Sequence, residues 1–157
     1  MVFREGRKYD FEAPYTMWGN EIMVGVNVNI ESDYDISSYS ERVEKRLIWI
    51  NKKRHVIELA MLENGMGESA EYWTSNNYAR DDDGGYILND GKKVFLPISD
   101  DDFCESLSLS EIAVNFEEDG TADIEMYFVC EPDYFDGHCI EILIDNDRNI
   151  VCDGISG

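Results

Sequence analysis

The chain has 157 residues, with 13 Lys and Arg against 34 Asp and Glu, which gives a formal net charge of −21 at pH 7. A field of this sign repels nucleic acid and anionic membranes and attracts basic proteins or cations. The length suits a single domain over residues 1–157, and a hydrophobic share of 43% argues against general disorder. We therefore expect a folded protein with a basic protein partner, although acidity that serves solubility alone stays open as the alternative. The oligomeric state does not follow from these features.

The negative charge is unevenly distributed. Residues 1–54 contain nine basic and nine acidic residues, whereas residues 55–157 contain four basic and 25 acidic ones. The first residues are followed by charged residues rather than by an apolar signal segment. No stretch approaches the roughly 18 apolar residues of a membrane span. The four cysteines have no C-x-x-C spacing, which favours reduced core thiols. These features predict a cytoplasmic protein whose whole acidic excess follows residue 54.

A strand pair opens the chain. Residues 22–30 alternate apolar and other side chains with a period of two, which is typical of a half-buried strand. Residues 8–18 are expected to form its partner strand, and Gly19-Asn20 supplies the turn between them.

A helix is predicted next. Ser38-x-x-Glu41 is a capping-box signature, and the apolar residues after it recur at helical spacing. These apolar residues are Tyr39, Val43, Leu47 and Ile50. The pattern can continue to Asn64-Gly65, a good helix stop, so one long helix is expected. Residues 51–53 mark either a kink or a break in it.

The middle of the chain is the least regular part. A long flexible acidic loop is expected over about residues 74–91, because Asp81, Asp82 and Asp83 precede two glycines. Ser99 then predicts the cap of a short acidic helix up to Leu107.

The remainder is predicted to be a meander of four strands, over residues 109–117, 121–130, 138–145 and 148–155. Apolar side chains share one parity in each strand, which is typical of an antiparallel sheet with one solvated face. The expected fold is therefore α+β with two layers, in which this meander packs against one long helix and a short helix. The residues expected to bind a partner from the solvated face are Glu111, Asp123, Glu125, Tyr127 and Glu141, with Asp81, Asp82 and Asp83 as a second patch.

No pattern of residues indicates a catalytic site, a cofactor or a metal. His55 lies among basic residues and is expected on an exposed helix position. His138 has the parity of Ile140 and should point inward, where a structural role is the simplest interpretation. Its neighbour Cys139 should face the other way, which is poor geometry for a catalytic pair. The acidic segment at residues 145–147 lacks the glycine and the bidentate glutamate of a calcium loop.

A motif near the C-terminus resembles one found in a bacterial family of unknown function. The run Asp133-Tyr134-Phe135-Asp136-Gly137-His138-Cys139-Ile140 is similar to an acidic-x-Phe-x-Gly-His-x-Ile pattern, and Glu71-x-Trp73 and Asp102-Phe103 look similar as well. The resemblance covers about residues 20–157. It implies an α+β domain of bacterial origin, similar to candidate immunity proteins encoded near polymorphic or contact-dependent toxins. Within the motif, Phe135, Gly137 and His138 are interpreted as structural.

Three functions remain open at this point. The first is an immunity protein that neutralises a basic toxin such as a nuclease. The second is a small enzyme or calcium-dependent module centred on His138 and nearby acids. The third is a regulatory interaction domain unrelated to toxins.

Overall fold

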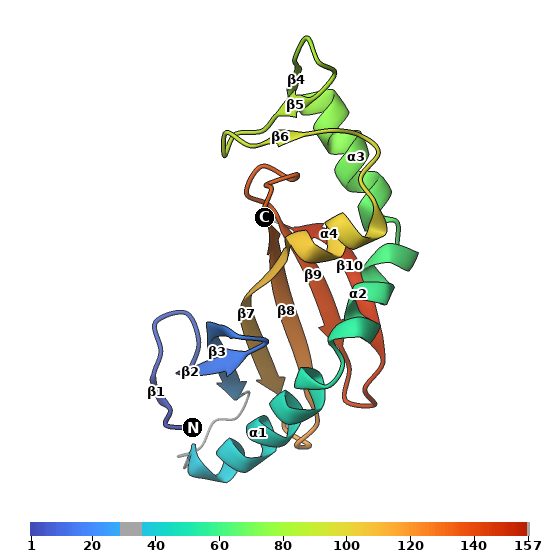
Figure 1. Ribbon diagram of the computed structural model, residues 1–157. Coiled ribbons are helices and arrows are strands. Elements are labelled where there is room, and N and C mark those ends of the chain that lie inside the picture. The colour runs from blue at the N-terminus through green and yellow to red at the C-terminus, as the bar shows by residue number, and fades with distance from the viewer. Residues whose placement is uncertain (29–35, 157) are drawn as a thin grey trace.

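A computed structural model describes residues 1–28 and 36–156 of the chain (Figure 1). Its main element is a seven-stranded sheet in the order β1-β2-β3-β7-β8-β9-β10. The strands are β1 (Arg4–Glu5), β2 (Phe11–Met17), β3 (Asn20–Val28), β7 (Leu107–Phe116), β8 (Ala122–Cys130), β9 (Cys139–Ile144) and β10 (Ile150–Ser156). Residues 29 and 30, the end of the predicted strand 22–30, lie outside the described residues.

The predicted meander is correct only for part of this sheet. Strands β7 to β10 pair with their neighbours in antiparallel fashion, as expected. However, β3 pairs with β7 in parallel, so the sheet is mixed. A parallel pair needs a long crossover connection, and here the segment between β3 and β7 carries the four helices of the described residues. No local sequence pattern in β3 or β7 predicts that these two strands pair.

The prediction of one long helix is wrong. The chain instead forms α1 (Ser37–Asn51), α2 (Arg54–Glu63) and α3 (Met66–Asn77), followed by the short α4 (Asp100–Ser106). The first break falls at the predicted residues 51–53, and Lys53 leaves helical geometry there. Gly65 separates α2 from α3 with a φ of 80°, a left-handed conformation that glycine adopts at low cost. The predicted stop at Asn64-Gly65 therefore ends one helix and starts another.

A second, small sheet follows α3. It consists of β4 (Ala79–Arg80), β5 (Tyr86–Ile87) and β6 (Lys93–Val94) in antiparallel order. The segment 74–91, for which the sequence predicts a long loop, thus holds the end of α3 and two of these strands. The small sheet and α3 extend beyond the end of the main sheet (Figure 1).

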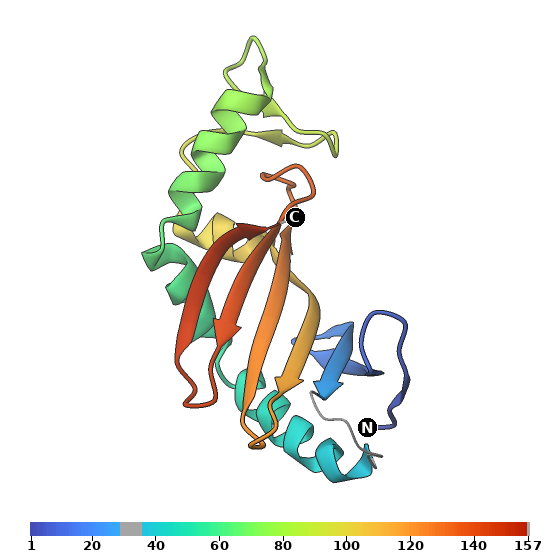
Figure 2. The same cartoon turned by 180° about the vertical axis from the view of Figure 1, so that it is seen from behind.

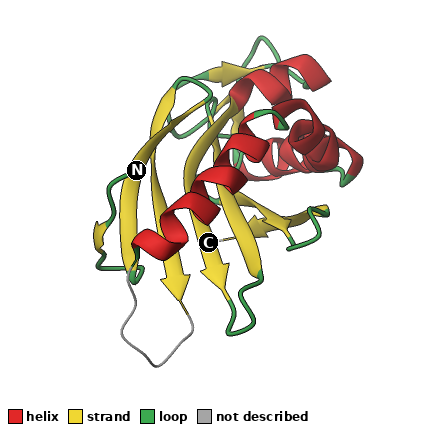
Figure 3. Ribbon diagram, turned by 90° about the horizontal axis from the view of Figure 1, so that it is seen from below, coloured by secondary structure: helices red, strands yellow, loops and turns green. Residues whose placement is uncertain are grey.

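Helices α1 and α2 cover one face of the main sheet (Figure 3). The predicted inner residues are buried beneath them: Ile112, Val114, Phe116, Ile124, Met126, Phe128, Ile140, Ile142 and Ile144. The apolar stripe of α1 at Tyr39, Val43, Leu47 and Ile50 is buried as well. All of these side chains belong to one hydrophobic core. The opposite face of β7 to β10 carries no helix (Figure 2).

Among the described residues, none of the helices combines the length and the apolar composition needed to cross a bilayer.

Candidate functional site

The strand register brings the predicted surface carboxylates together on the uncovered face. Glu111 of β7 lies opposite Tyr127 of β8, which lies opposite Glu141 of β9. In the next row, Ala113 lies opposite Glu125, which lies opposite Leu143. We call this surface the open sheet face, made of the outward side chains of β7 to β10. Its members are Glu111, Asp123, Glu125, Tyr127, Glu141, Leu143, Val151 and Asp153.

A hydrogen-bond network fixes the centre of the open sheet face. The Tyr127 hydroxyl donates to Glu125 Oε2 over 2.6 Å, and Asn115 Nδ2 donates to Glu125 Oε1 over 3.4 Å. Asn27 Nδ2 in turn donates to Asn115 Oδ1 over 2.8 Å. The Glu125 carboxylate is therefore held in place by partners from two neighbouring positions, and its orientation is set before any ligand arrives.

The N-terminal loop closes over one end of this face. Tyr9 is buried and packs against Gly25 of β3, at a spacing that leaves no room for a side chain at residue 25. Lys8 Nζ lies 2.7 Å from Glu111 Oε1 and 5.8 Å from the centre of the Tyr127 ring. This loop covers β3 and β7, so the part left open lies over β8, β9 and β10. Sequence reasoning missed Lys8 and Tyr9, because nothing local places Lys8 beside Glu111, 103 residues away, or Tyr9 over Gly25.

The electrostatics of the face are those of crowded carboxylates. Burial, followed by the neighbouring Glu125 and Asp153, raises the pKa of Glu141 above its usual value. Burial, followed by the hydrogen bond to Glu125, also raises the pKa of the Tyr127 hydroxyl. Burial is thus the main cause of both shifts, and the neighbouring carboxylates add to it.

A hollow of about 380 Å³ lies at the β8–β10 side of the open sheet face. Its apolar lining includes Leu143 and Val151, and Val151 is 54% exposed. Three carboxylates line it as well, those of Asp123, Glu125 and Asp145. Asp123 is exposed, and Glu125 is half-buried. We call this feature the acid-rimmed hollow, and it combines an apolar patch with negative charge at its margin.

The second predicted patch has a different environment. Asp81 and Asp83 flank the β4–β5 turn, and both accept from Lys93 of β6, with distances of 2.7 and 2.8 Å to its Nζ. Hydrogen bonds from Lys93 and from backbone amides lower the pKa of both carboxyls. Asp82 stays exposed beside them. The patch therefore lies on the small sheet, apart from the open sheet face, and Lys93 offsets part of its charge.

The Gly-His motif forms a structured bend. Gly137 has a φ of 81°, and its amide donates to Asp133 Oδ1 over 2.9 Å. The His138 amide donates to the carbonyl of Phe135 over 3.1 Å, and Phe135 is buried in the core. His138 was predicted to point inward, and the structure shows it only half-buried. Strand β9 begins at Cys139, so the strand parity does not extend to His138, which is half-buried with its ring 5.4 Å from that of Trp73.

Carboxylates and histidines are not arranged for metal binding in the described part of the chain, where no group of three or more metal-ligating side chains comes together. In the acidic segment at residues 145–147, the Asp145 carboxylate accepts from the backbone and side-chain nitrogens of Asn149, over 2.9 and 2.8 Å. This arrangement closes the β9–β10 turn. His55 is exposed, as predicted.

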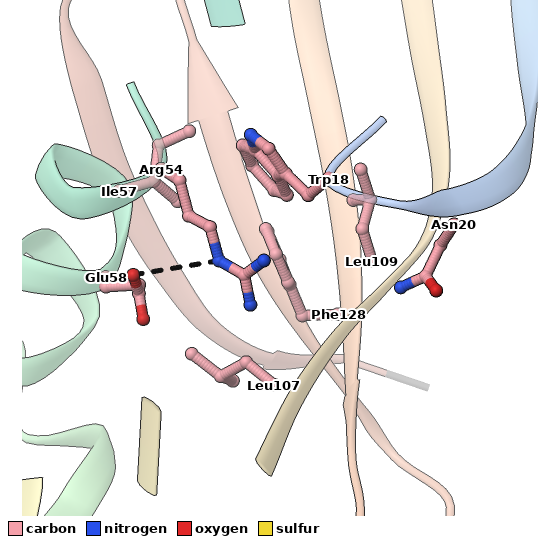
Figure 4. A pocket seen from close by; sticks show the side chains of 8 residues that line it. All are labelled: Trp18, Asn20, Arg54, Ile57, Glu58, Leu107, Leu109 and Phe128. Carbon is pink, nitrogen blue, oxygen red and sulfur yellow. Dashed lines mark ion pairs between the residues drawn. The ribbon is translucent and has the colours of Figure 1, made fainter. Parts of the chain in front are cut away.

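The corner where the β2–β3 turn meets α2 is filled by side chains (Figure 4). Arg54 extends between Glu58, at 3.8 Å, and the ring of Trp18, at 5.3 Å. Trp18 also stacks on Phe128 and donates from Nε1 to the carbonyl of Asn51. The space left is about 10 Å³, which is about the room that one water molecule needs. This corner ties helix to sheet and is not a ligand site.

No curated protein and no solved structure matches the chain. One family model does match, and it covers residues 6–155. The prediction that the chain belongs to a bacterial family of unknown function is confirmed. The chain belongs to the family described as uncharacterized protein conserved in bacteria (DUF2262).

Proposed function

We propose that the protein is an acidic binding domain that engages a basic protein through the open sheet face. The observation that carries this proposal is the acid-rimmed hollow, in which Leu143 and Val151 lie beside the carboxylates of Asp123 and Glu125. A lysine or arginine side chain has an apolar stem and a charged head. The stem would pack on the apolar lining, and the head would reach the rim.

The remaining acids of the face extend this recognition. Glu141 and Asp153 lie on the adjoining strands, and among the described residues Lys8 alone forms an ion pair with an acid of this face, at Glu111. A surface with one dominant sign accelerates encounter with an oppositely charged partner and disfavours partners of like charge. Because the carboxylates stand on paired strands, little conformational entropy is lost when they bind.

We further propose that the partner is a basic toxin, for example a nuclease, and that binding neutralises it. Two features support this finer proposal: the net charge of −21, and the likeness of the motif at residues 133–140 to candidate immunity proteins. A nuclease cleft is basic because it binds phosphates. Carboxylates spaced across strands would occupy such a cleft in place of the nucleic acid backbone.

The direct experiment uses the purified product of the neighbouring gene as the candidate partner. Binding is measured by titration calorimetry at low and at physiological salt, with the wild-type chain and the variant Asp123→Lys. The variant should weaken binding about tenfold or more, because it places a cation at the rim of the hollow. Glu63→Lys is the matched control, since Glu63 is exposed on α2, on the helical side of the sheet.

The results separate the two levels of the proposal. Salt-sensitive binding that Asp123→Lys weakens and Glu63→Lys does not would support the face as the interface. Loss of the partner's toxicity on co-expression would support neutralisation. Equal effects of the two variants would reject the open sheet face, and absence of any complex would reject the partner.

A further inference from the structure

A second cavity, of about 290 Å³, lies on the helical side of the sheet, where the end of α1 meets the β9–β10 turn. Its lining is basic, in contrast to the rest of this acidic chain. The lining residues used below are Lys45, Arg46 and Trp49 of α1, with Asp145, Asn146 and Arg148 of the turn. We call this feature the basic cavity. It lies next to the acid-rimmed hollow but is independent of the proposed function.

The two arginines of the basic cavity have only neutral partners. Arg46 donates to Asn146 Oδ1 and to the carbonyl of Arg42, each over 3.2 Å. The Arg148 guanidinium lies 5.4 Å from the centre of the Trp49 ring. Within the described residues, no carboxylate oxygen comes within 4.0 Å of either guanidinium. Neither arginine therefore forms an ion pair with a described residue, although the Asp145 carboxylate belongs to the same lining.

The one carboxylate in the lining is already engaged. Both oxygens of Asp145 accept from Asn149, and the amide of Arg148 donates to the carbonyl of Asp145 over 3.0 Å. Arg148 itself has a φ of 68°, a left-handed conformation that only a tight turn imposes. These contacts fix the turn and hold the Arg148 backbone at the mouth of the cavity. The side chain of Lys45 is exposed at the same mouth and pairs with Glu41 over 3.1 Å.

The arrangement is electrostatically costly as it stands. Burial, followed by the nearby charges of Arg42 and Arg148, lowers the pKa of Arg46. Arg42, Arg46 and Arg148 thus lie close enough for their charges to repel one another. An anion bound between Arg46 and Arg148 would remove the repulsion.

We propose that the basic cavity binds a phosphate group, either as inorganic phosphate or as a small phosphate monoester. Guanidinium groups match phosphate oxygens with two parallel hydrogen bonds, and two of them balance a charge close to −2. Lys45 adds a third donor at the mouth. The Trp49 ring already contacts Arg148 and Lys53, at 5.4 and 5.6 Å, so the site recognises the charged group rather than a stacked aromatic ring.

The test is a titration of the labelled full-length chain by NMR, following the side-chain N–H signals of its arginines. The probes are inorganic phosphate, glycerol 3-phosphate and acetate at equal ionic strength. We expect saturable shifts at Arg46 and Arg148 with inorganic phosphate, with glycerol 3-phosphate, or with both. Saturation by the inorganic ion identifies free phosphate as sufficient, whereas saturation by the ester alone identifies a monoester site. Equal saturation by acetate would overturn the phosphate assignment.

Two variants sharpen the result. Arg148→Gln should weaken binding about tenfold or more, because it removes a charge-assisted pair. Arg80→Gln is the matched control, since Arg80 is exposed on β4 and remote from the cavity. Arg46→Lys keeps the charge but loses the planar guanidinium that can donate two parallel hydrogen bonds. It should weaken binding while the thermal unfolding midpoint stays unchanged. Absence of saturation by either phosphate probe in the millimolar range, or an equal effect of Arg80→Gln, would reject the site.

Discussion

The open sheet face and the Asp81–Asp83 turn are both rich in acidic residues, yet they differ in what their carboxylates contact. On the open sheet face, the acids stand on paired strands around an apolar hollow, and one lysine, Lys8, reaches them. At the turn, a single lysine, Lys93, lies within 2.8 Å of both Asp81 and Asp83. The number of acidic residues in a segment therefore says little about the negative potential that a partner would meet.

The physical difference lies in spacing. Strand neighbours project side chains at fixed intervals, which keeps like charges apart yet on one surface. A tight turn lets adjacent carboxylates converge on one cation and on backbone amides. The first arrangement leaves charge available for a partner, and the second uses it for local structure.

The largest expected effect comes from disrupting the packing of Tyr9, in the N-terminal loop, against strand β3 next to the open sheet face. In Gly25→Ala, the new Cβ would lie 2.0 Å from Tyr9 Cδ2, so the ring must leave its place. We expect a loss of about 2 kcal/mol in the free energy of unfolding, measured by urea denaturation. Gly67→Ala is the control, because its Cβ meets only Leu62 at 3.9 Å and should be neutral or slightly stabilising. Equal stability of both variants would contradict the packing argument.

A smaller effect is expected from loosening the network at the centre of the face. Tyr127→Phe removes the hydroxyl that donates to Glu125 over 2.6 Å. The expected cost is about 1 kcal/mol in the free energy of unfolding, because the partner is a half-buried carboxylate. Tyr72→Phe serves as the control, since Tyr72 is 71% exposed. If chemical denaturation shows the same change for both, the network does not stabilise the face.

The crowding of carboxylates predicts a pH dependence. The pKa of Glu141 is raised in the folded state by burial and by Glu125 and Asp153, so its charged form destabilises the fold. That penalty is fully present above the folded pKa and disappears as the pH falls below the unfolded value of about 4.3. Glu141→Gln should therefore be more stable than wild type at pH 7, by less than about 1 kcal/mol after solvent screening, and equal to it in acid.

Paired denaturation curves at the two pH values measure this difference. Glu63→Gln, at an exposed position of α2, is the control and should show no such trend. A Glu141→Gln advantage that persists in acid would point to packing rather than charge.

The smallest effect concerns the turn. Hydrogen bonds from Lys93 are the main cause that lowers the pKa of Asp81 and of Asp83. In Lys93→Gln, both pKa values should rise towards those of free aspartate, as followed by carbon NMR of the side-chain carboxyls. Lys92→Gln is the matched control, because Lys92 pairs with Glu131 instead. Unchanged pKa values in Lys93→Gln would mean that the turn is not compensated by this lysine.

Much of the local structure was predictable, because it depends on residues close in sequence. The short helix α4 is capped as expected, with Ser99 Oγ accepting from the amide of Asp102 over 3.1 Å. The alternation in β7, β8 and β9 predicted which side chains are buried and which carboxylates share a face. The three acidic residues at 81–83 were equally visible, but Lys93, which pairs with Asp81 and Asp83, comes from another strand.

The sequence by itself determined the charge, the strand faces and the surface on which Glu111, Glu125 and Glu141 stand, since a period of two fixes the direction of each side chain. Only the tertiary structure decided the parallel pairing of β3 with β7 and the position of Lys8 over the open sheet face. It also decided the meeting of Arg46 and Arg148 in the basic cavity. Each of these depends on contacts between residues about 80 or more positions apart, which no local propensity reports.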